Sequence, residues 1–263
     1  MNSVHQLRLY LIALQFLTRV PVPRWVGFEP AWLHDSARHF PGVGLFVGGV
    51  ASAVLWTAGQ LWPAAVAVGL SIAATLWLTG AFHEDGLADS ADALGGAVSR
   101  ERALVIMKDS RIGSYGALAL LVVLGLKASV LVALAQREVA LVLIALPVAH
   151  TWSRAVPVAL LRGLQYAGDP EHAKAKPMAQ QVSRVSLALA LVWCLATGLG
   201  AVLLGISAAA LCIAALASAL AGLILARWFK RRLGGYTGDT LGAAQQGTEL
   251  VILLALLAST GHG

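Results

Sequence analysis

Acidic residues are rare in this chain, and their placement is the feature that most clearly points to chemistry. Only 13 of the 263 residues are Asp or Glu, and four of them fall together: Glu84, Asp85, Asp89 and Asp92. In a helix the last three lie on one face, because they follow i, i+4, i+7 spacing. Like charges held so close repel unless a cation lies between them. The spacing therefore predicts a metal site with Glu84 as a further ligand; the alternative is a solvated helix end that binds nothing.

The ligand types restrict which metal such a site would take. Carboxylate oxygens are hard ligands, and no Cys or His pair stands at metal-binding spacing, so Mg²⁺ is favoured, or Mn²⁺, over zinc. Metal ions held by carboxylates can clamp a diphosphate and neutralise the charge on its leaving group. The acidic cluster thus favours a transfer reaction on a phosphorylated substrate.

Further candidate residues lie in two other segments. Asp109 follows the cluster within Lys-Asp-Ser-Arg at 108–111, and Thr237 and Asp239 lie in the glycine-rich stretch 234–240. A glycine-rich loop can present backbone N–H groups to phosphate, although a plain connection between helices is equally expected.

Two ionisable residues, His150 and Arg154, stand one helical turn apart inside an apolar run. They either hold an anionic group in a polar cavity, or carry a charge that snorkels toward the interface or is paired inside the helix bundle. Lys127, also within an apolar run, has no assignment from the sequence.

The composition is that of an integral membrane protein. Apolar residues make up 58% of the chain, against roughly 45–50% in ordinary soluble domains, and only 12% are charged. The same numbers exclude a disordered chain. Cys194 and Cys212 lie in apolar runs, which argues against a disulfide framework. We expect no nucleic-acid partner, because the net charge of +6 is spread over segments that flank apolar runs, where anionic lipids and anionic substrates lie.

The apolar runs predict an all-α, polytopic transmembrane helix bundle of six to seven spans, forming a single domain over 1–263. Each run is about 20 residues long, the length that crosses a bilayer. A weaker seventh segment covers 241–259 and contains Glu249. Residues 7–17 predict an interfacial or bundle-packed helix rather than a signal peptide. Glycines such as Gly44, Gly48 and Gly49 suit close helix packing in lipid. The six stronger runs are 42–61, 63–82, 115–135, 139–161, 185–204 and 206–226.

Basic residues mark one side of the predicted bundle. Four segments carry four Lys or Arg residues each, so 16 of the 19 basic residues lie on the side where six spans place all four segments. By the positive-inside rule, the N-terminus and the long loops are cytoplasmic. The active site is then expected on that side, built from the 83–114 loop and the 227–249 segment. The basic residues are Arg8, Arg19, Arg24 and Arg38; Arg100, Arg102, Lys108 and Arg111; Arg162, Lys174, Lys176 and Arg184; and Arg227, Lys230, Arg231 and Arg232.

One long block of sequence resembles the core signature of the cobalamin synthase family. It reads His-Glu-Asp-Gly-Leu-Ala-Asp-Ser-Ala-Asp-Ala-Leu-Gly-Gly at 83–96 and continues through 101–104 and 106–113. Shorter blocks resemble other family segments, in the same order, so the resemblance spans nearly the whole chain. They are Phe-Leu-Thr-Arg-Val-Pro at 16–21, Phe-Pro-Gly-Val-Gly at 40–44, and Gly-Gly-Tyr-Thr-Gly-Asp at 234–239 with the following 241–249.

The resemblance implies a specific reaction and location. Members of the family join adenosylcobinamide-GDP to α-ribazole or its 5′-phosphate, giving adenosylcobalamin or its 5′-phosphate and GMP. The family uses Mg²⁺ and works at the bacterial plasma (inner) membrane. The implied partners are these substrates and the lipid bilayer, with a homo-oligomer or an association with other corrinoid-assembly enzymes as further expectations.

Roles follow from charge and chemistry once this reaction is assumed. Asp85, Asp89 and Asp92 are expected to hold the metal ions, with Asp85 central to catalysis. Asp109 is expected to be either a fourth ligand or the base that accepts the hydroxyl proton. The expected contacts to the diphosphate and nucleotide are Lys108, Arg111, Arg231, Arg232, Thr237 and Asp239.

Two other function classes compete with this interpretation. A lipid-forming CDP-alcohol phosphotransferase shares the chemistry, but its Asp-Gly-x-x-Ala-Arg pattern is absent, since Asp85-Gly86 is followed by Leu-Ala-Asp-Ser and no Ala-Arg stands at that spacing. A divalent-cation transporter would need acidic residues buried near mid-membrane.

Overall fold

A computed structural model describes residues 3–168 and 182–259. These residues form helices and no strand, and one isolated bridge pairs Tyr166 with Tyr236. The predicted all-α fold is confirmed. Lys174 and Lys176, which contributed to the charge pattern, lie outside the described residues. The helices are α1 (Ser3–Leu17), α2 (Pro30–Ser36), α3 (Phe40–Gly59), α4 (Ala64–Thr79), α5 (Phe82–Gly95), α6 (Arg100–Ile106), α7 (Ser114–Arg137), α8 (Val139–Gly163), α9 (Arg184–Leu203), α10 (Ala208–Leu233) and α11 (Gly238–Ser259), with short 3₁₀ turns at Arg24–Val26 and Ala37–His39.

The number of membrane-spanning helices agrees with the prediction, although the set differs. Among the described residues six segments are long and apolar enough to span a membrane. The first covers residues 30–59 and ends with α3, and the other five are the helices α7, α8, α9, α10 and α11. The weak segment 241–259 is one of them. The predicted span 63–82 is instead the 16-residue α4, which meets α5 at an angle of 88°. Counted as one bent span, this pair gives up to seven. The chain is a multi-pass membrane protein.

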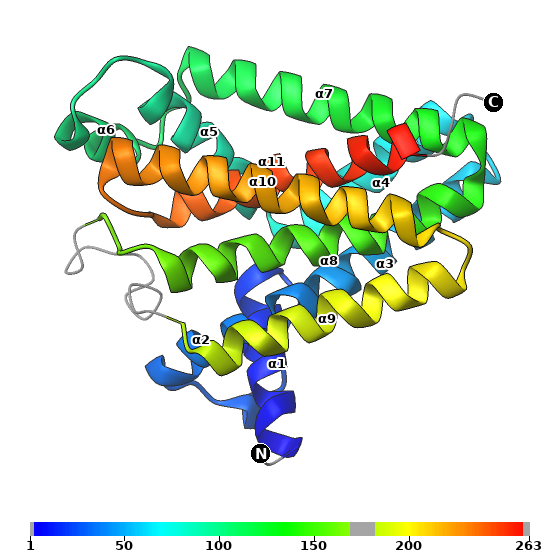
Figure 1. The fold of residues 1–263 in the computed structure, drawn as a ribbon, viewed down its shortest axis with the longest axis horizontal. Coiled ribbons are helices and arrows are strands. Elements are labelled where there is room, and N and C mark those ends of the chain that lie inside the picture. Colours follow the sequence, from blue (N-terminus) through cyan, green and yellow to red (C-terminus); the bar gives the residue numbers. More distant parts are fainter. Residues whose placement is uncertain (1–2, 169–181, 260–263) are drawn as a thin grey trace.

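Helix α11 lies at the centre of the bundle. Helices α7 to α11 run along the long axis in alternating directions (Figure 1). Helix α11 packs against α5, α7, α8 and α10, and 67% of its apolar window is buried, against 22% for α7 and for α9. Its polar residues gave it the weakest hydropathy signal of the predicted spans. That weak signal reflects a helix surrounded by protein rather than by lipid.

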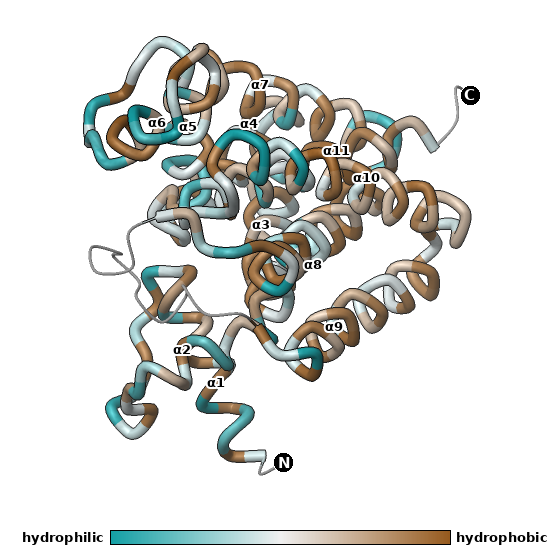
Figure 2. The backbone as a smooth tube through the Cα atoms, turned by 60° about the vertical axis from the view of Figure 1, so that its left-hand side comes forward, coloured by the Kyte–Doolittle hydropathy of each residue, from teal (hydrophilic) through white to brown (hydrophobic). Residues whose placement is uncertain are grey.

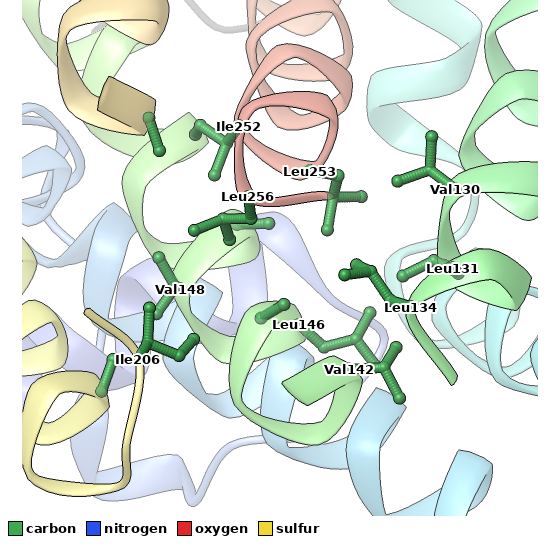
Figure 3. Packing of buried hydrophobic residues seen from close by; sticks show 14 of the residues in the cluster. Val130, Leu131, Leu134, Val142, Leu146, Val148, Ile206, Ile252, Leu253 and Leu256 are labelled. Atoms are coloured by element: carbon green, nitrogen blue, oxygen red, sulfur yellow. The ribbon is translucent and has the colours of Figure 1, made fainter. Parts of the chain in front are cut away.

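Aliphatic side chains fill the bundle interior and also cover its outside. Figure 3 shows side chains of α7, α8 and α11 meeting in one apolar cluster, with Leu134, Leu146 and Leu253 fully buried. On the outer faces, leucines such as Leu195 and Leu216 are strongly exposed, at 72% and 71%. Lipid tails satisfy such surfaces as well as other leucines do, so helix association in a membrane depends on close packing.

Two glycines allow α3 to approach α8 closely. A Cβ atom at Gly48 would lie 2.6 Å from the Cα of Pro147, and one at Gly44 would overlap the His150 carbonyl group. The predicted packing role of these two glycines is confirmed. Gly49, in contrast, has no neighbour within 4 Å, so its expected contact is absent.

The polar segments gather at one end of the bundle, which we call the α5 end. Helices α7, α9 and α11 begin there, α8 and α10 end there, and α5 and α6 lie at the same end (Figure 1). Figure 2 shows hydrophilic stretches around α5 and α6, and also around α1 and α2, whereas α9 and α10 are mostly hydrophobic. The fold thus brings the predicted 83–114 and 227–249 segments together.

Candidate active site

A left-handed turn separates α4 from α5. Gly80 and Ala81 have φ of +67° and +57°. The N–H of Ala81 donates to the Leu76 carbonyl (2.8 Å), the bond that typically closes a helix ending in a left-handed glycine. Arg19 lies against Gly80, because a Cβ there would come within 2.8 Å of its Nε. The acidic residues therefore stand on a helix of their own, not on a continuation of the preceding span.

The carboxylate of Asp92 is hydrogen-bonded to the start of α7. It accepts hydrogen bonds from the backbone N–H groups of Gly113 and Gly116, each 2.8 Å long. A Cβ atom on either glycine would overlap this carboxylate, which explains the two glycines. The unpaired N–H groups at a helix start are strong donors, and a carboxylate satisfies them well. The structure gives Asp92 this helix-capping contact instead of the predicted place in a carboxylate cluster.

Glu84 points into the bundle rather than alongside the aspartates. Its side chain is only 8% exposed, and its Oε1 accepts a hydrogen bond from Nε2 of Gln246 in α11 (2.8 Å). Positions 84 and 85 are 100° apart around a helix, so an inward Glu84 leaves Asp85 outward. Asp85 is indeed exposed, and Asp89 is half-buried.

The start of α11 lies directly against α5. A Cβ atom at Gly86 would be 2.8 Å from the carbonyl oxygen of Asp239, and one at Gly242 would be 3.1 Å from that of His83. Both glycines are required for this contact. Residues 85–89 and 239, separated by about 150 positions in sequence, are thereby neighbours, as the site prediction requires.

The residues present fit a magnesium site in which substrate phosphates supply some of the ligands. Among residues 3–168 and 182–259, no three Asp, Glu, His or Cys side chains come close enough to form a preassembled metal site. The four-carboxylate cluster is therefore not assembled in this part of the chain. Mg²⁺, however, is commonly bound by one or two carboxylates together with substrate phosphates. Asp85 and Asp89, with Asp239 across the α5–α11 contact, have the oxygen chemistry for such a site.

Asp109 and Arg111 form an exposed ion pair. Arg111 donates through Nε and Nη2 to the Asp109 carboxylate, at 3.0 and 2.6 Å, and its side chain is 86% exposed. These hydrogen bonds lower the pKa of Asp109 from 3.8 to about 2. A general base works best with a pKa near the working pH, so Asp109 in this pairing is a poor proton acceptor.

The glycine-rich stretch folds into a tight helix start. Thr237 and Thr240 cap α11 reciprocally: each backbone N–H donates to the other residue's hydroxyl oxygen, at 2.8 and 3.2 Å. The hydroxyl of Thr237 also donates to Sδ of Met107 (3.5 Å), and the residue is 5% exposed. The hydroxyl of Thr237 is thus buried and already hydrogen-bonded, and its contact to the nucleotide stays a prediction.

The basic candidates divide into two kinds. Arg232 donates to the carbonyl oxygens of Leu94 and Gly96, at 2.9 and 2.8 Å, and so ties the end of α10 to the end of α5. Lys108 and Arg231 are exposed at the α5 end. These two remain candidates for phosphate contacts, whereas Arg232 has a structural partner.

A buried ionic network joins α7, α8 and α11 in the bundle interior next to α5. Some of its residues stood out in the sequence, but their contacts did not. Lys127 in α7 forms an ion pair with Glu249 in α11, and Glu249 also contacts Nδ1 of His150 in α8 (3.2 Å). Arg154, one turn along, donates to the His150 carbonyl (2.9 Å). All four are at most 3% exposed. Of the two interpretations of His150 and Arg154, pairing inside the bundle is therefore confirmed.

Two glutamines extend this network to α5. Gln245 donates to Glu249 (2.6 Å) and Ser153 (2.9 Å), while Gln246 donates to Gln245 Oε1 and to Glu84 (both 2.8 Å). The sequence carried one signal for them, namely polar residues within a span. Which residues they contact could be seen only in the fold.

Comparison with known proteins places the chain in a family. The sequence pattern of the cobalamin-5-phosphate synthase family matches residues 9–257. A Leptothrix cholodnii protein named adenosylcobinamide-GDP ribazoletransferase is 64% identical over 255 residues, covering 97% of each chain. Proteins of the same name from Albidiferax ferrireducens and Shewanella amazonensis are 45% and 44% identical, over 95% and 96% of this chain and 97% and 95% of theirs. No solved structure matches it. This chain belongs to the cobalamin-5-phosphate synthase family.

Proposed function

We infer that this protein is an adenosylcobinamide-GDP ribazoletransferase, the activity for which its relatives over nearly the full chain are named. In the proposed reaction a hydroxyl oxygen of α-ribazole, or of its 5′-phosphate, attacks the phosphorus that stays with cobinamide. The bond from that phosphorus to GMP breaks, and the hydroxyl proton is released. The observation that carries this inference is the full-length family match, together with an acidic helix at the polar end of a membrane bundle.

We propose that Mg²⁺ is held by Asp85 and Asp89 together with substrate phosphates. Asp239, whose backbone lies against Gly86, is a further candidate ligand. When bound, the ion would neutralise charge on the diphosphate and on departing GMP. The exposed Lys108 and Arg231 would bind phosphate oxygens from the rim. Asp85, the most exposed of the three aspartates, is the candidate acceptor of the hydroxyl proton, since the pKa of Asp109 is too low for that role.

We further propose that the protein lies in the bacterial inner membrane with the α5 end facing the cytoplasm. The support is the charge pattern. Of the basic segments predicted to be cytoplasmic, the parts that the structure describes lie around that end. Assembly as a homo-oligomer, or with other corrinoid-assembly enzymes, remains a proposal from the family resemblance.

The test is an activity assay on purified protein in lipid nanodiscs. Adenosylcobinamide-GDP and α-ribazole are supplied with Mg²⁺ or with EDTA, and both GMP release and cobalamin formation are followed. We expect the two products in equal amounts, with Mg²⁺ only. Asp85→Asn should raise the Mg²⁺ concentration required at least about tenfold, since metal ligands and their supports typically contribute that much. Glu138→Gln, which changes an exposed acid between α7 and α8, is the matched control. Release of CMP from a CDP-linked lipid, with no GMP release, would refute the proposal.

A further inference from the structure

We propose that Glu84 and Asp92 are positioning residues, which clamp α5 at its two ends and so set the orientation of Asp85 and Asp89. The assignment of Asp85 and Asp89 to the metal rests on the proposed function; the clamping of α5 does not. Four acids that look alike in sequence then divide into two pairs with different tasks.

Such clamps are needed because α5 is not a continuation of α4. The two helices meet at 88° through the left-handed pair Gly80 and Ala81, so the rotation of α5 about its own axis is not inherited from the preceding span. A rotation of α5 by one residue, 100°, would carry Asp85 into the inward position that Glu84 now has. Contacts of α5 with its neighbours must therefore fix which acids face outward.

The first clamp joins Glu84 to α11. The carboxylate is buried, and the amide of Gln246 donates to it at 2.8 Å. The same amide nitrogen donates to Gln245, which is bonded to Glu249 and, through it, to Lys127. Gln246 is therefore held by a network that spans α7, α8 and α11, and it offers Glu84 a fixed partner rather than a mobile one. Leaving a buried group of this kind without its partner carries the full desolvation cost.

The second clamp joins Asp92 to α7. Its two carboxylate oxygens accept from the N–H groups of Gly113, the residue that caps α7, and Gly116, three residues further on. Within a single helix start these two donors are often satisfied by two side chains of a capping box. Here one carboxylate from another helix satisfies both. Clamps near either end of a 14-residue helix restrain its rotation and its sliding together.

The experiment measures amide hydrogen exchange of residues 82–95 in nanodiscs, in EDTA, alongside the Mg²⁺ half-saturation of GMP release. Working without metal separates positioning from ligation, because a ligand has no effect when no ion is present. The variants are Glu84→Leu, Gln246→Leu, their double, Asp92→Ala and Asp92→Asn, with Asp85→Ala as the ligand-type comparison. Ser71→Ala is the control, since it removes a buried hydrogen bond to Ala51 (2.8 Å) between α4 and α3.

We expect α5 to exchange about tenfold faster in Glu84→Leu, Gln246→Leu and Asp92→Ala, the size expected for loss of a buried hydrogen bond. The Glu84/Gln246 double should be no worse than either single, and Asp92→Asn, which keeps one acceptor oxygen, should be intermediate. Asp85→Ala and Ser71→Ala should leave α5 exchange unchanged. The clamp variants that loosen α5 should also raise the Mg²⁺ half-saturation.

Two results would overturn the proposal. One is wild-type exchange of α5 in the Glu84 and Asp92 variants; the other is a raised Mg²⁺ half-saturation in Glu84→Leu that Gln246→Leu does not reproduce. Failure of the proposed function is a separate outcome, because absence of GMP release by the wild type leaves the exchange result for the clamps intact.

Discussion

Lys127 lies within a membrane span, and the fold shows what it does there: it neutralises Glu249. Both side chains are at most 4% exposed. Replacing Lys127 with Met keeps the length of the side chain. Within the described part of the chain, Glu249 then keeps the Gln245 amide (2.6 Å) and His150 (3.2 Å) as partners. Breaking a buried ion pair by removing one partner costs about 3–5 kcal/mol. Because two partners remain, we expect about 3 kcal/mol, the lower end of that range.

The double variant Lys127→Met/Glu249→Gln separates charge from hydrogen bonding. Removing both charges leaves no stranded ion, so the double should recover most of the loss, with a coupling energy of about 3 kcal/mol. An ordinary hydrogen bond between membrane helices contributes only about 0.6 kcal/mol on average. The measurement is denaturant-induced unfolding in mixed micelles, with Ser129→Ala as the control. Ser129 lies in the same helix, and its hydroxyl donates to the Gly125 carbonyl one turn away. Additive single effects, or a coupling near 0.6 kcal/mol, would refute the reasoning about a buried charge pair.

Three further predictions concern packing, backbone and pH. Gly48→Leu should destabilise the protein by about 1–3 kcal/mol through overpacking between α3 and α8, whereas Gly49→Leu, which has open space, should not shift the unfolding midpoint in detergent. Gly80→Ala should cost about 1–2 kcal/mol, because φ is +67°, and the same unfolding assay would detect it; an unchanged midpoint would mean that the turn tolerates a side chain. The pairing with Arg111 lowers the pKa of Asp109 to about 2, so its stabilising effect is present above the ordinary value of 3.8 and is lost only as the pH falls toward 2. Asp109→Asn should therefore leave the shape of the pH–activity profile between about pH 5 and 9 unchanged, and loss of an acidic limb in that range would restore Asp109 as the base.

That the chain is a membrane protein could be predicted from the sequence, because membrane insertion depends on the hydrophobicity summed over the residues of a segment. Transfer of about 20 apolar residues into a bilayer is favourable wherever the segment occurs, so five of the six strong runs correspond to α3, α7, α8, α9 and α10. Basic residues flanking those runs add a pattern that is likewise read along the chain. The blocks at 83–113 and 234–249 pointed to the family, which the full-length match confirms.

The tertiary structure decided which of the similar residues do what. Glu84, Asp85, Asp89 and Asp92 differ little as sequence, but Glu84 meets Gln246 at a sequence separation of 162, and Asp92 meets Gly113 and Gly116. Hydrogen bonds of this kind depend on where distant helices pack, and local spacing carries no information about that.

The same reason explains the other differences from expectation. The break between α4 and α5 depends on two residues in the left-handed conformation, Gly80 and Ala81. Glycine is the residue that usually marks this conformation in a sequence, so the alanine gave no sign of it. The buried network of Lys127, Glu249 and His150 assembles from three helices. Burial of a charge costs far more than any local preference, and only the packed bundle determines whether a partner stands beside it.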